Sequence, residues 1–307
     1  MPISATTRCC AVYGSPIKHS ASPAMQNAGI AALGLDWRYL AFEVRPADLR
    51  QAIQGALAMR FVGLNLTVPH KLLAMDMVDA LDESAKTWGA VNTICFKAQD
   101  ADRRWVSLGQ LEDLPAGEIR SQGFNTDADA ITRALREDLG VEPHGAKVLL
   151  LGAGGAGRTA ALKLASEGAR ALWLVNRTVS KAAELAREIQ ARFPEVQVTT
   201  GYPKEEVDLL LNATSAGLRS DDPLPLDEGQ FSLARSRAVY DMIYRPATTP
   251  LLRAAAAAGC RTANGLGMLL YQGARALELW SGQAAPVQAM REALERSVYG
   301  PPGVSAH

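Results

Sequence analysis

The chain has 307 residues, and its 32 basic and 32 acidic side chains leave no formal net charge. This balance gives no electrostatic basis for binding nucleic acid or an anionic membrane, so we expect a small-molecule partner, no nucleic acid and no membrane association. The length is sufficient for two domains, and the four cysteines, which lack metal-ligand or disulfide spacing, fit a reducing cytoplasm.

The first third of the chain alternates strand-like and helix-like segments. Apolar runs predict strands at 9–13, 37–42, 63–68 and 90–96, with helices at 23–33 and 46–59 and short helical segments at 71–77 and 82–88. This pattern is typical of a small α/β domain. The next segment, 97–122, is polar, has no sustained periodicity and contains Gly109, Pro115 and Gly117, which predicts a hairpin or surface excursion.

A helix is predicted at 126–139, and a buried strand at 147–151 then leads into the glycine turn 152–157. In a dinucleotide-binding fold such glycines allow a tight turn, a close approach to the pyrophosphate, and close packing of helix on strand. About 20 residues later an NAD site carries an acidic residue, but the strand 171–175 ends here in Asn176 and Arg177. Arg177, with Thr178 and Lys181, matches a ribose 2′-phosphate, which favours NADP over NAD; the alternative is a solvated arginine after a strand.

Most of the remaining elements are expected to complete this nucleotide domain, and the two terminal helices are expected to belong to the other domain. Strands at 196–199, 207–212 and 238–243 and helices at 180–193 and 249–258 predict a doubly wound sheet. The terminal helices 268–280 and 286–298 are amphipathic and must bury their apolar faces elsewhere. We therefore expect an α/β fold with two domains: an N-terminal substrate domain, 1–123, completed by C-terminal helices, 264–307, and a Rossmann-type domain, 124–263.

Polar clusters in a fixed order carry a family resemblance. They lie at 14–23, 63–71, 89–93, 125–127, 152–157, 176–178, 212–217, 241–246 and 265–272. Together they resemble the shikimate dehydrogenase family over nearly the whole chain. The resemblance implies an NADP-dependent oxidoreductase that reversibly reduces 3-dehydroshikimate to shikimate in aromatic amino-acid biosynthesis, acting as a monomer or homodimer.

The resemblance also implies roles for individual residues. Lys71 and Asp127 are implied as the catalytic acid–base pair, although alone they would be a surface lysine and a carboxylate at a helix N-terminus. The implied substrate ligands are Ser20, Ser22, Asn65, Thr67, Asn92, Tyr244 and Gln272. The implied cofactor ligands are Gly152, Ala153, Gly154, Gly155, Ala156, Asn176, Arg177, Thr178, Lys181, Thr214, Ser215, Met242 and Gly265.

Local patterns qualify some of these roles. Ser20 and Ser22 share a face if their segment is extended. The resemblance implies that they bind the substrate carboxylate with Thr67; the alternative is local helix capping before Pro23. Tyr244 is either a substrate ligand or a buried strand tyrosine. His19 and His70 have no second ligand at metal spacing, so we expect no metal site.

Two departures from the family pattern stand out. Ala128 and Ala130 occupy positions where the family usually has glycine, and the excursion 97–122 is longer than usual. A broader quinate and shikimate dehydrogenase is therefore an alternative, as is a catalytically silent, nucleotide-sensing relative. The presence of both Lys71 and Asp127 argues against the silent relative.

Overall fold

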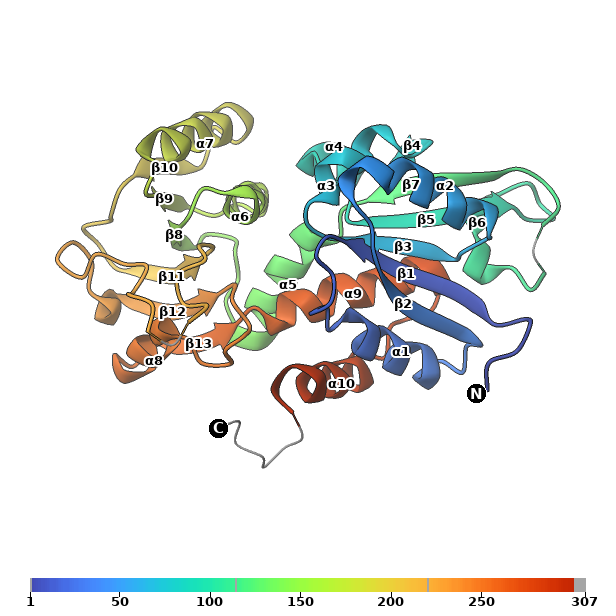
Figure 1. Ribbon diagram of the computed structural model, residues 1–307. Helices are drawn as coiled ribbons and strands as arrows, with labels where there is room; N and C mark the ends of the chain where they lie inside the picture. The colour runs from blue at the N-terminus through green and yellow to red at the C-terminus, as the bar shows by residue number, and fades with distance from the viewer. Residues whose placement is uncertain (1, 114, 220, 301–307) are drawn as a thin grey trace. The chain divides into compact units, whose positions relative to one another are not determined.

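The computed structural model describes residues 2–113, 115–219 and 221–300. The chain divides into two compact units (Figure 1). Unit 1 contains the described residues up to Asp127 together with those from Leu270 onward, and unit 2 is Ala128–Leu269. Asp127 therefore lies in the same unit as Lys71.

Unit 1 is built on a mixed sheet. Its described strands are β1 (Arg8–Gly14), β2 (Trp37–Glu43), β3 (Gly63–Leu66), β4 (Ala80–Leu81), β5 (Thr93–Gln99), β6 (Trp105–Ser107) and β7 (Ile119–Phe124). They are ordered β2-β1-β3-β5-β7-β4, with β6 paired to β5. The strands β2, β1 and β3 are parallel, whereas β5 runs antiparallel to both β3 and β7. The start of β5 and the end of β7 thus meet the end of β3 at one edge of the sheet.

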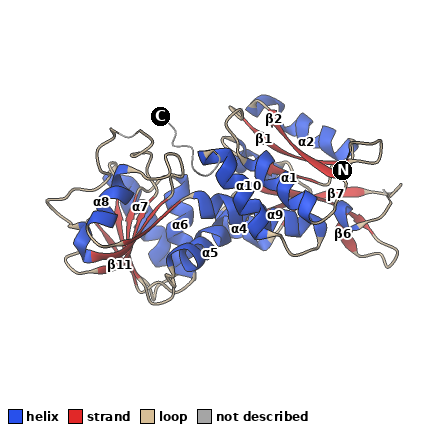
Figure 2. Cartoon of the chain, turned by 90° about the horizontal axis from the view of Figure 1, so that it is seen from below, coloured by secondary structure: helices blue, strands red, loops and turns tan. Residues whose placement is uncertain are grey.

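Helices cover both faces of this sheet. They are α1 (Ser22–Ala32), α2 (Leu49–Ala58), α3 (His70–Leu73), α4 (Glu83–Trp88), α9 (Leu266–Ser281) and α10 (Val287–Tyr299), with 3-10 turns η1 (Pro46–Asp48), η2 (Ala74–Asp76) and η3 (Leu108–Gln110). In α2, Leu49 and Ile53 lie one turn apart and join the same buried cluster as Leu64 of β3. On α9, the indole of Trp280 donates to the carbonyl of Ile94 at 3.0 Å. Figure 2 shows β1 and β2 between α2 on one side and α1, α9 and α10 on the other.

The prediction of a surface excursion over 97–122 is wrong at its C-terminal end. The hairpin part exists, since β5 and β6 pair antiparallel from Lys97 with Ser107. Residues 119–124, however, form β7, an inner strand between β5 and β4. Its pattern was obscured because Ser121 and Gly123 occupy buried positions where large apolar residues are usual; a Cβ on Gly123 would lie 2.7 Å from Val91.

Unit 2 is a doubly wound sheet, which confirms the predicted fold class. Its described strands are β8 (Lys147–Leu151), β9 (Ala171–Val175), β10 (Gln197–Thr200), β11 (Val207–Asn212), β12 (Ser236–Asp241) and β13 (Arg261–Asn264). All neighbours are parallel, in the order β10-β9-β8-β11-β12-β13. Numbered from β8, this is the dinucleotide-binding order 3-2-1-4-5-6. The helices are α5 (Asp127–Leu139), α6 (Gly155–Ser166), α7 (Val179–Arg192) and α8 (Pro250–Ala257), with the 3-10 turn η4 (Leu233–Arg235).

The strand order places a topological switch point between β8 and β11. Ligands of open α/β sheets bind outside the carboxyl ends of the strands at such a point. The central strands are continuous apolar runs, as fully covered parallel strands require, and Leu149, Leu150 and Leu210 have no exposed surface. The sequence prediction missed β13, a short edge strand that is mostly polar and has no buried residue.

Candidate active site

Lys71 and Asp127 form a direct ion pair in unit 1. The ammonium Nζ of Lys71 donates to Oδ2 of Asp127 at 2.7 Å, and the two side chains are 32% and 13% exposed. Lys71 lies on the short helix α3 directly after β3, and its carbonyl accepts from the amide of Val91, which anchors α3 to the start of β5. Asp127 opens α5 directly after β7. The pair therefore stands at the shared edge of three strands, and it is neither deeply buried nor fully solvated.

A buried group of amides and hydroxyls, which we term the amide–hydroxyl network, lies at the ends of the same strands. Asn65 donates through Nδ2 to Oγ1 of Thr93 at 3.0 Å. Asn92 accepts from the amide of Thr126 at 2.8 Å and donates to its Oγ1 at 3.0 Å. The hydroxyls of Thr93 and Thr126 are 3.2 Å apart, and no member is more than 6% exposed. Since Thr126 directly precedes Asp127, this network fixes the approach to the carboxylate.

Tyr39 is a member of this network that the sequence did not reveal. Its hydroxyl donates to Oδ1 of Asn65 at 2.8 Å, and its side chain is fully buried. Burial raises the pKa of Tyr39 well above its usual value, so the phenol stays protonated and remains a donor. With Oδ1 held by Tyr39, the amide of Asn65 is fixed with its NH₂ group toward Thr93.

The segment Ser20–Ser22 is not extended, so the condition for these two serines to share a strand face is not met. Ser22 is the first residue of α1, and Ala21 has helical angles, φ −87° and ψ −5°. The two serines therefore do not share a strand face. Oγ of Ser20 accepts from the amide of Ser22 at 3.3 Å, but the N-cap residue of α1 is Ala21, and no side chain caps this helix. The helix begins at Ser22 because Pro23 at its second position favours a helix start over a continued strand.

Two further residues of unit 1 were named as substrate ligands. Thr67 follows β3, where its amide donates to the carbonyl of Tyr13 at 3.0 Å. Gln272 lies on α9 and is partly exposed. In the described chain, Thr67 has no hydrogen bond to Lys71, Asp127 or the network.

His70 immediately precedes Lys71 and is fully buried. Burial lowers the pKa of this imidazole, although its hydrogen bond to the carbonyl of Val44 at 2.7 Å acts in the opposite direction. A neutral His70 therefore holds the start of α3 against the loop after β2. Among residues 2–113, 115–219 and 221–300, no group of three or more His, Cys, Asp or Glu side chains is placed to hold a metal ion.

In unit 2 the glycine turn leads from β8 into α6. Gly152 has φ +103°, a conformation that favours glycine. A Cβ on Gly157 would lie 2.0 Å from the carbonyl oxygen of Gly152, so only glycine allows the helix to start this close to the strand. Gly154 and Gly155 are exposed with open space at their Cβ positions, and no side chain caps α6. The N–H groups of its first turn are thus open to an anion.

The loop after β9 stands beside this turn. Asn176 accepts from the amide of Ala153 at 2.9 Å and donates to the carbonyl of Thr178 at 2.8 Å, so it ties the glycine turn to the loop. Arg177, Thr178 and Lys181 are exposed. Within the described chain, the guanidinium of Arg177 has no hydrogen bond or ion pair. Asn176 therefore links the glycine turn to the loop after β9, and the guanidinium of Arg177 is available to bind an anionic group.

On the β12 side of the switch point, the buried carboxylate of Asp241 holds neighbouring loops in place by hydrogen bonds. It accepts from Thr249 Oγ1 at 2.6 Å, from Asn212 Nδ2 at 2.9 Å and from the amide of Ile243 at 3.1 Å. Burial raises its pKa, and these three donors oppose the rise. Asn212 in turn accepts from the amide and hydroxyl of Thr214. The loops after β11 and β12 are thus held by one network that the sequence prediction did not include.

The remaining residues named for cofactor binding lie on these loops. Gly152 packs against the loop after β11, because a Cβ there would lie 3.0 Å from the backbone of Ala213 and from Thr214. Gly265 lies against Met242, whose carbonyl oxygen would be 2.0 Å from a Cβ on that glycine. Ser215 is exposed and Tyr244 is partly exposed, the latter on the loop that follows Met242. The structure therefore brings the predicted cofactor residues of unit 2 to the carboxyl ends of adjacent strands.

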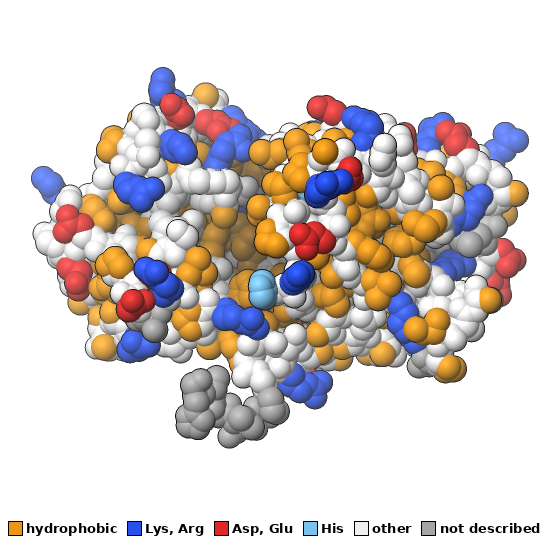
Figure 3. Space-filling view, in the orientation of Figure 1, with side chains coloured by type: hydrophobic (Ala, Val, Ile, Leu, Met, Phe, Trp, Pro, Cys, Tyr) orange, Lys and Arg blue, Asp and Glu red, His pale blue; other side chains and the backbone are white. Residues whose placement is uncertain are grey.

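The surface offers a neutral mixture of charges. Lys and Arg side chains are interspersed with Asp and Glu on the face seen in Figure 3. No helix within the described residues is long and apolar enough to cross a bilayer.

Comparison with known proteins decides the family. The shikimate dehydrogenase substrate-binding domain family matches residues 12–94, the shikimate/quinate 5-dehydrogenase family matches 135–219, and the shikimate 5′-dehydrogenase C-terminal domain family matches 265–295. The NADP(+) shikimate dehydrogenase of Methanopyrus kandleri is 40% identical over 299 residues, covering 95% of this chain and 96% of the relative. The chain belongs to the shikimate dehydrogenase family.

Solved structures agree with this membership. A shikimate dehydrogenase in complex with NADP+ superposes with a TM-score of 0.81 at 33% identity, over 97% of this chain and 98% of the other. The ligand-free 5-ketofructose reductase of Gluconobacter sp. strain CHM43 has a TM-score of 0.79 at 32% identity, over 95% and 99%. The fold of this chain is therefore also found in a reductase that is named for 5-ketofructose, another polyhydroxylated ketone.

The residues of unit 2 fit NADP. The open first turn of α6 suits a pyrophosphate, and the strand-end arginine suits a 2′-phosphate, which a carboxylate at that position would repel. The open Cβ positions of Gly154 and Gly155 leave room for the phosphates to approach the backbone. The missed residues Tyr39 and Asp241 act through other side chains, which is why no local motif identifies them.

Proposed function

We propose that this protein is an NADP-dependent shikimate dehydrogenase that reversibly reduces 3-dehydroshikimate to shikimate. The observation that carries the proposal is the 2.7 Å pair of Lys71 and Asp127 beside the amide–hydroxyl network. Bound NADPH supplies the hydride. Reduction of a ketone also requires a proton at its oxygen. An ammonium held by a carboxylate can donate that proton, and in the oxidative direction the neutral amine of the same lysine accepts it.

The substrate carries a carboxylate and several hydroxyls, and unit 1 has groups suited to each. Ser20, Ser22 and Thr67 supply hydroxyls for the carboxylate. Asn65, Asn92 and Gln272 are proposed partners of the substrate hydroxyls, because neutral amides both donate and accept. The hydrogen bond from Asn65 Nδ2 to the carbonyl of Asn92 is long, 3.4 Å, and therefore weak. We propose that the N–H of Asn65 that makes this bond donates to the substrate instead. Tyr244 of unit 2 is proposed to reach the carboxylate.

The two units then have distinct roles. Unit 1 is proposed as the substrate-binding unit and unit 2 as the NADP-binding unit. The four cysteines are unpaired thiols in the structure, which supports residence in a reducing cytoplasm. We propose a monomer or homodimer.

Steady-state rates with the purified protein test this function. Shikimate and quinate, each with NADP and with NAD, give four values of kcat/KM, and the pair shikimate with NADP is expected to give the highest. In the reductive direction, 5-ketofructose with NADPH serves as the comparison substrate. Equal rates on quinate would instead assign the broader enzyme, and no turnover of any pair would assign the nucleotide-sensing relative.

Tyr39→Phe tests the role of the amide–hydroxyl network. Removal of the hydroxyl leaves Oδ1 of the buried Asn65 without its donor, which costs about 1–3 kcal/mol of unfolding free energy. It also frees the amide to rotate, so we expect KM for shikimate to rise several-fold while kcat changes less. Urea unfolding and steady-state kinetics measure the two effects.

The matched control is Tyr202→Phe in unit 2. This change removes a phenol hydroxyl that accepts from the amide of Asp227 at 2.9 Å, and should lower stability without altering KM for shikimate. An unchanged KM in the Tyr39 variant would mean that the phenol only stabilises the fold.

A further inference from the structure

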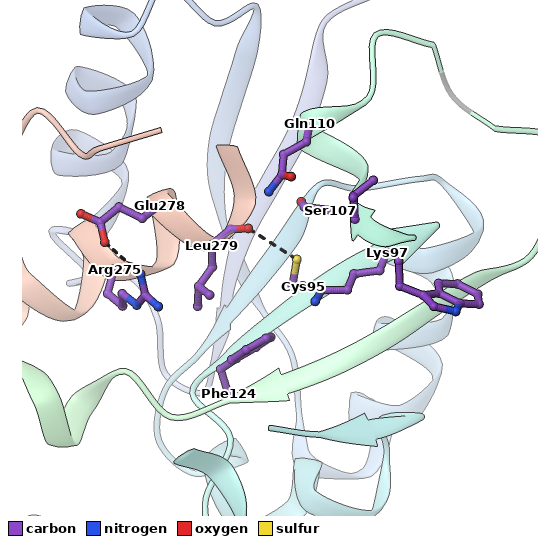
Figure 4. Close-up of a pocket in the computed structure, with 10 residues that line it drawn as sticks. Cys95, Lys97, Ser107, Gln110, Phe124, Arg275, Glu278 and Leu279 are labelled. Atoms are coloured by element: carbon purple, nitrogen blue, oxygen red, sulfur yellow. Dashed lines mark hydrogen bonds and ion pairs between the residues drawn. The ribbon is translucent and has the colours of Figure 1, made fainter. Parts of the chain in front are cut away.

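A cavity of about 250 Å³ opens in unit 1 and shares no residue with the proposed active site. Ten residues line it, from β5, β6, η3, the end of β7 and α9 (Figure 4). One water occupies roughly 30 Å³ in the liquid, so the cavity holds about eight waters or one small organic molecule. Part of its wall is the segment 97–110, which belongs to the unusually long excursion.

Two cations face this cavity from different elements. Lys97 of β5 and Arg275 of α9 extend toward the same opening from opposite sides (Figure 4). Lys97 is half-buried and has no carboxylate partner within the described chain; its ammonium lies 5.7 Å from the ring centre of Phe124. Arg275 pairs with Glu278 at 3.2 Å, and Glu278 is the one carboxylate of the lining. The wall therefore carries a single net positive charge.

The rest of the lining supplies neutral donors and apolar surface. Ser107 and the amide of Gln110 are polar, and burial raises the pKa of the Cys95 thiol to about 11, so that group stays neutral. Phe124 and Leu279 provide an apolar floor. A lysine held in a partly desolvated site without a counterion is unfavourable, and an anion between the two cations relieves that cost.

We propose that this cavity is a second ligand site that binds a small ring-containing monocarboxylate. The carboxylate lies between Lys97 and Arg275, and the ring packs on Phe124 and Leu279. A single negative charge matches the net charge of the lining, and two cations with a neutral amide match the oxygens of a carboxylate. The apolar floor selects against a bare inorganic anion, which would leave that surface unused.

Benzoate is the probe for this site, and benzamide, which has the same shape without the charge, is its neutral counterpart. Isothermal titration calorimetry on the full chain is expected to detect benzoate and not benzamide. Lys97→Gln and Arg275→Gln should each weaken benzoate binding about ten-fold or more, the scale of a lost charge-assisted hydrogen bond. Lys97→Arg keeps the charge and should retain binding, which separates a lost contact from a damaged fold.

Two controls keep this test separate from the proposed function. Lys86→Gln removes an exposed lysine that pairs with Glu83 at 2.7 Å outside the cavity, and it should leave benzoate binding unchanged. Ser22→Ala, in the proposed substrate site, should also leave it unchanged. If benzoate does not bind, binds no better than benzamide, or is weakened by Ser22→Ala and not by Lys97→Gln, the second site does not exist. None of these results depends on dehydrogenase activity.

Discussion

Lys71→Ala is expected to lower kcat for shikimate oxidation by about 100-fold or more, the usual contribution of a positioned acid or base. The ammonium is the group that we propose to exchange a proton with the substrate oxygen, and no other cation pairs with Asp127 in the described chain. NADP binding should change little, because the cofactor residues lie in unit 2. Steady-state kinetics and calorimetric titration of NADPH measure the two quantities. Lys86→Ala, which breaks the 2.7 Å ion pair with Glu83, is the matched control and should retain full kcat.

The double variant decides whether Lys71 and Asp127 work as a unit. Asp127→Asn should also be slow, because the amide no longer holds the ammonium in place. Residues that act together give losses that do not multiply, so the double variant should be about as slow as Lys71→Ala alone. A loss equal to the product of the two single losses would mean that the residues act independently. Thermal unfolding should show only small changes, because a partly exposed ion pair contributes about 1 kcal/mol or less.

Elements with strong apolar patterning were predictable from sequence. The strands β8, β11 and β12 each contain four or more buried residues in a row, and α2 and α7 have apolar residues at helical spacing, so local physics alone identifies them. The strands β7 and β13 were missed for opposite reasons. In β7 the buried positions are filled by Ser121 and Gly123, whose small size is needed against neighbouring side chains; β13 lies at a sheet edge and has little apolar surface to bury.

The residues of the candidate site also fall into two groups, those that sequence motifs identified and those that they did not. Motifs next to strand ends placed Lys71, Asp127 and the glycine turn where the structure has them, because parallel strands bring their carboxyl ends together. Tyr39 and Asp241 were missed because each bonds an asparagine far away in sequence: Asn65 lies 26 positions from Tyr39, and Asn212 lies 29 positions from Asp241. Their roles depend on tertiary contacts that no local pattern encodes. Ser20 and Ser22 do not share a strand face because the helix begins one residue earlier than expected, at Ser22.

Ala128 and Ala130, which occupy positions after Asp127 where the family usually has glycine, are interior residues. Ala128 is fully buried and Ala130 is 2% exposed, both on α5. Their methyl groups therefore pack within the protein rather than projecting into solvent. Alanine also favours the helical conformation over glycine by about 1 kcal/mol, so the substitution stabilises the helix that Asp127 begins.

The second large effect is expected at the cofactor. Arg177→Ala should weaken NADP binding by about 1.5–3 kcal/mol, equivalent to roughly 10- to 150-fold in Kd, because it removes a charge-assisted contact to the 2′-phosphate. Arg177 is exposed and has no carboxylate partner in the described chain, so its removal breaks no ion pair and should leave the fold intact. NAD lacks the 2′-phosphate and should bind the variant as it binds the parent.

Calorimetric titration of parent and variant with NADPH and with NADH measures this difference. Arg187→Ala is the matched control: Arg187 is an exposed arginine on the following helix α7, and its guanidinium donates to the carbonyl of Ala183 at 3.4 Å. Its loss should change neither affinity. The NADPH effect should also shrink as salt rises, because an exposed contact between charges is screened over a Debye length of about 10 Å at 0.1 M. Equal losses for both cofactors would place Arg177 against a part of the nucleotide that NAD and NADP share, and the 2′-phosphate assignment would then be wrong.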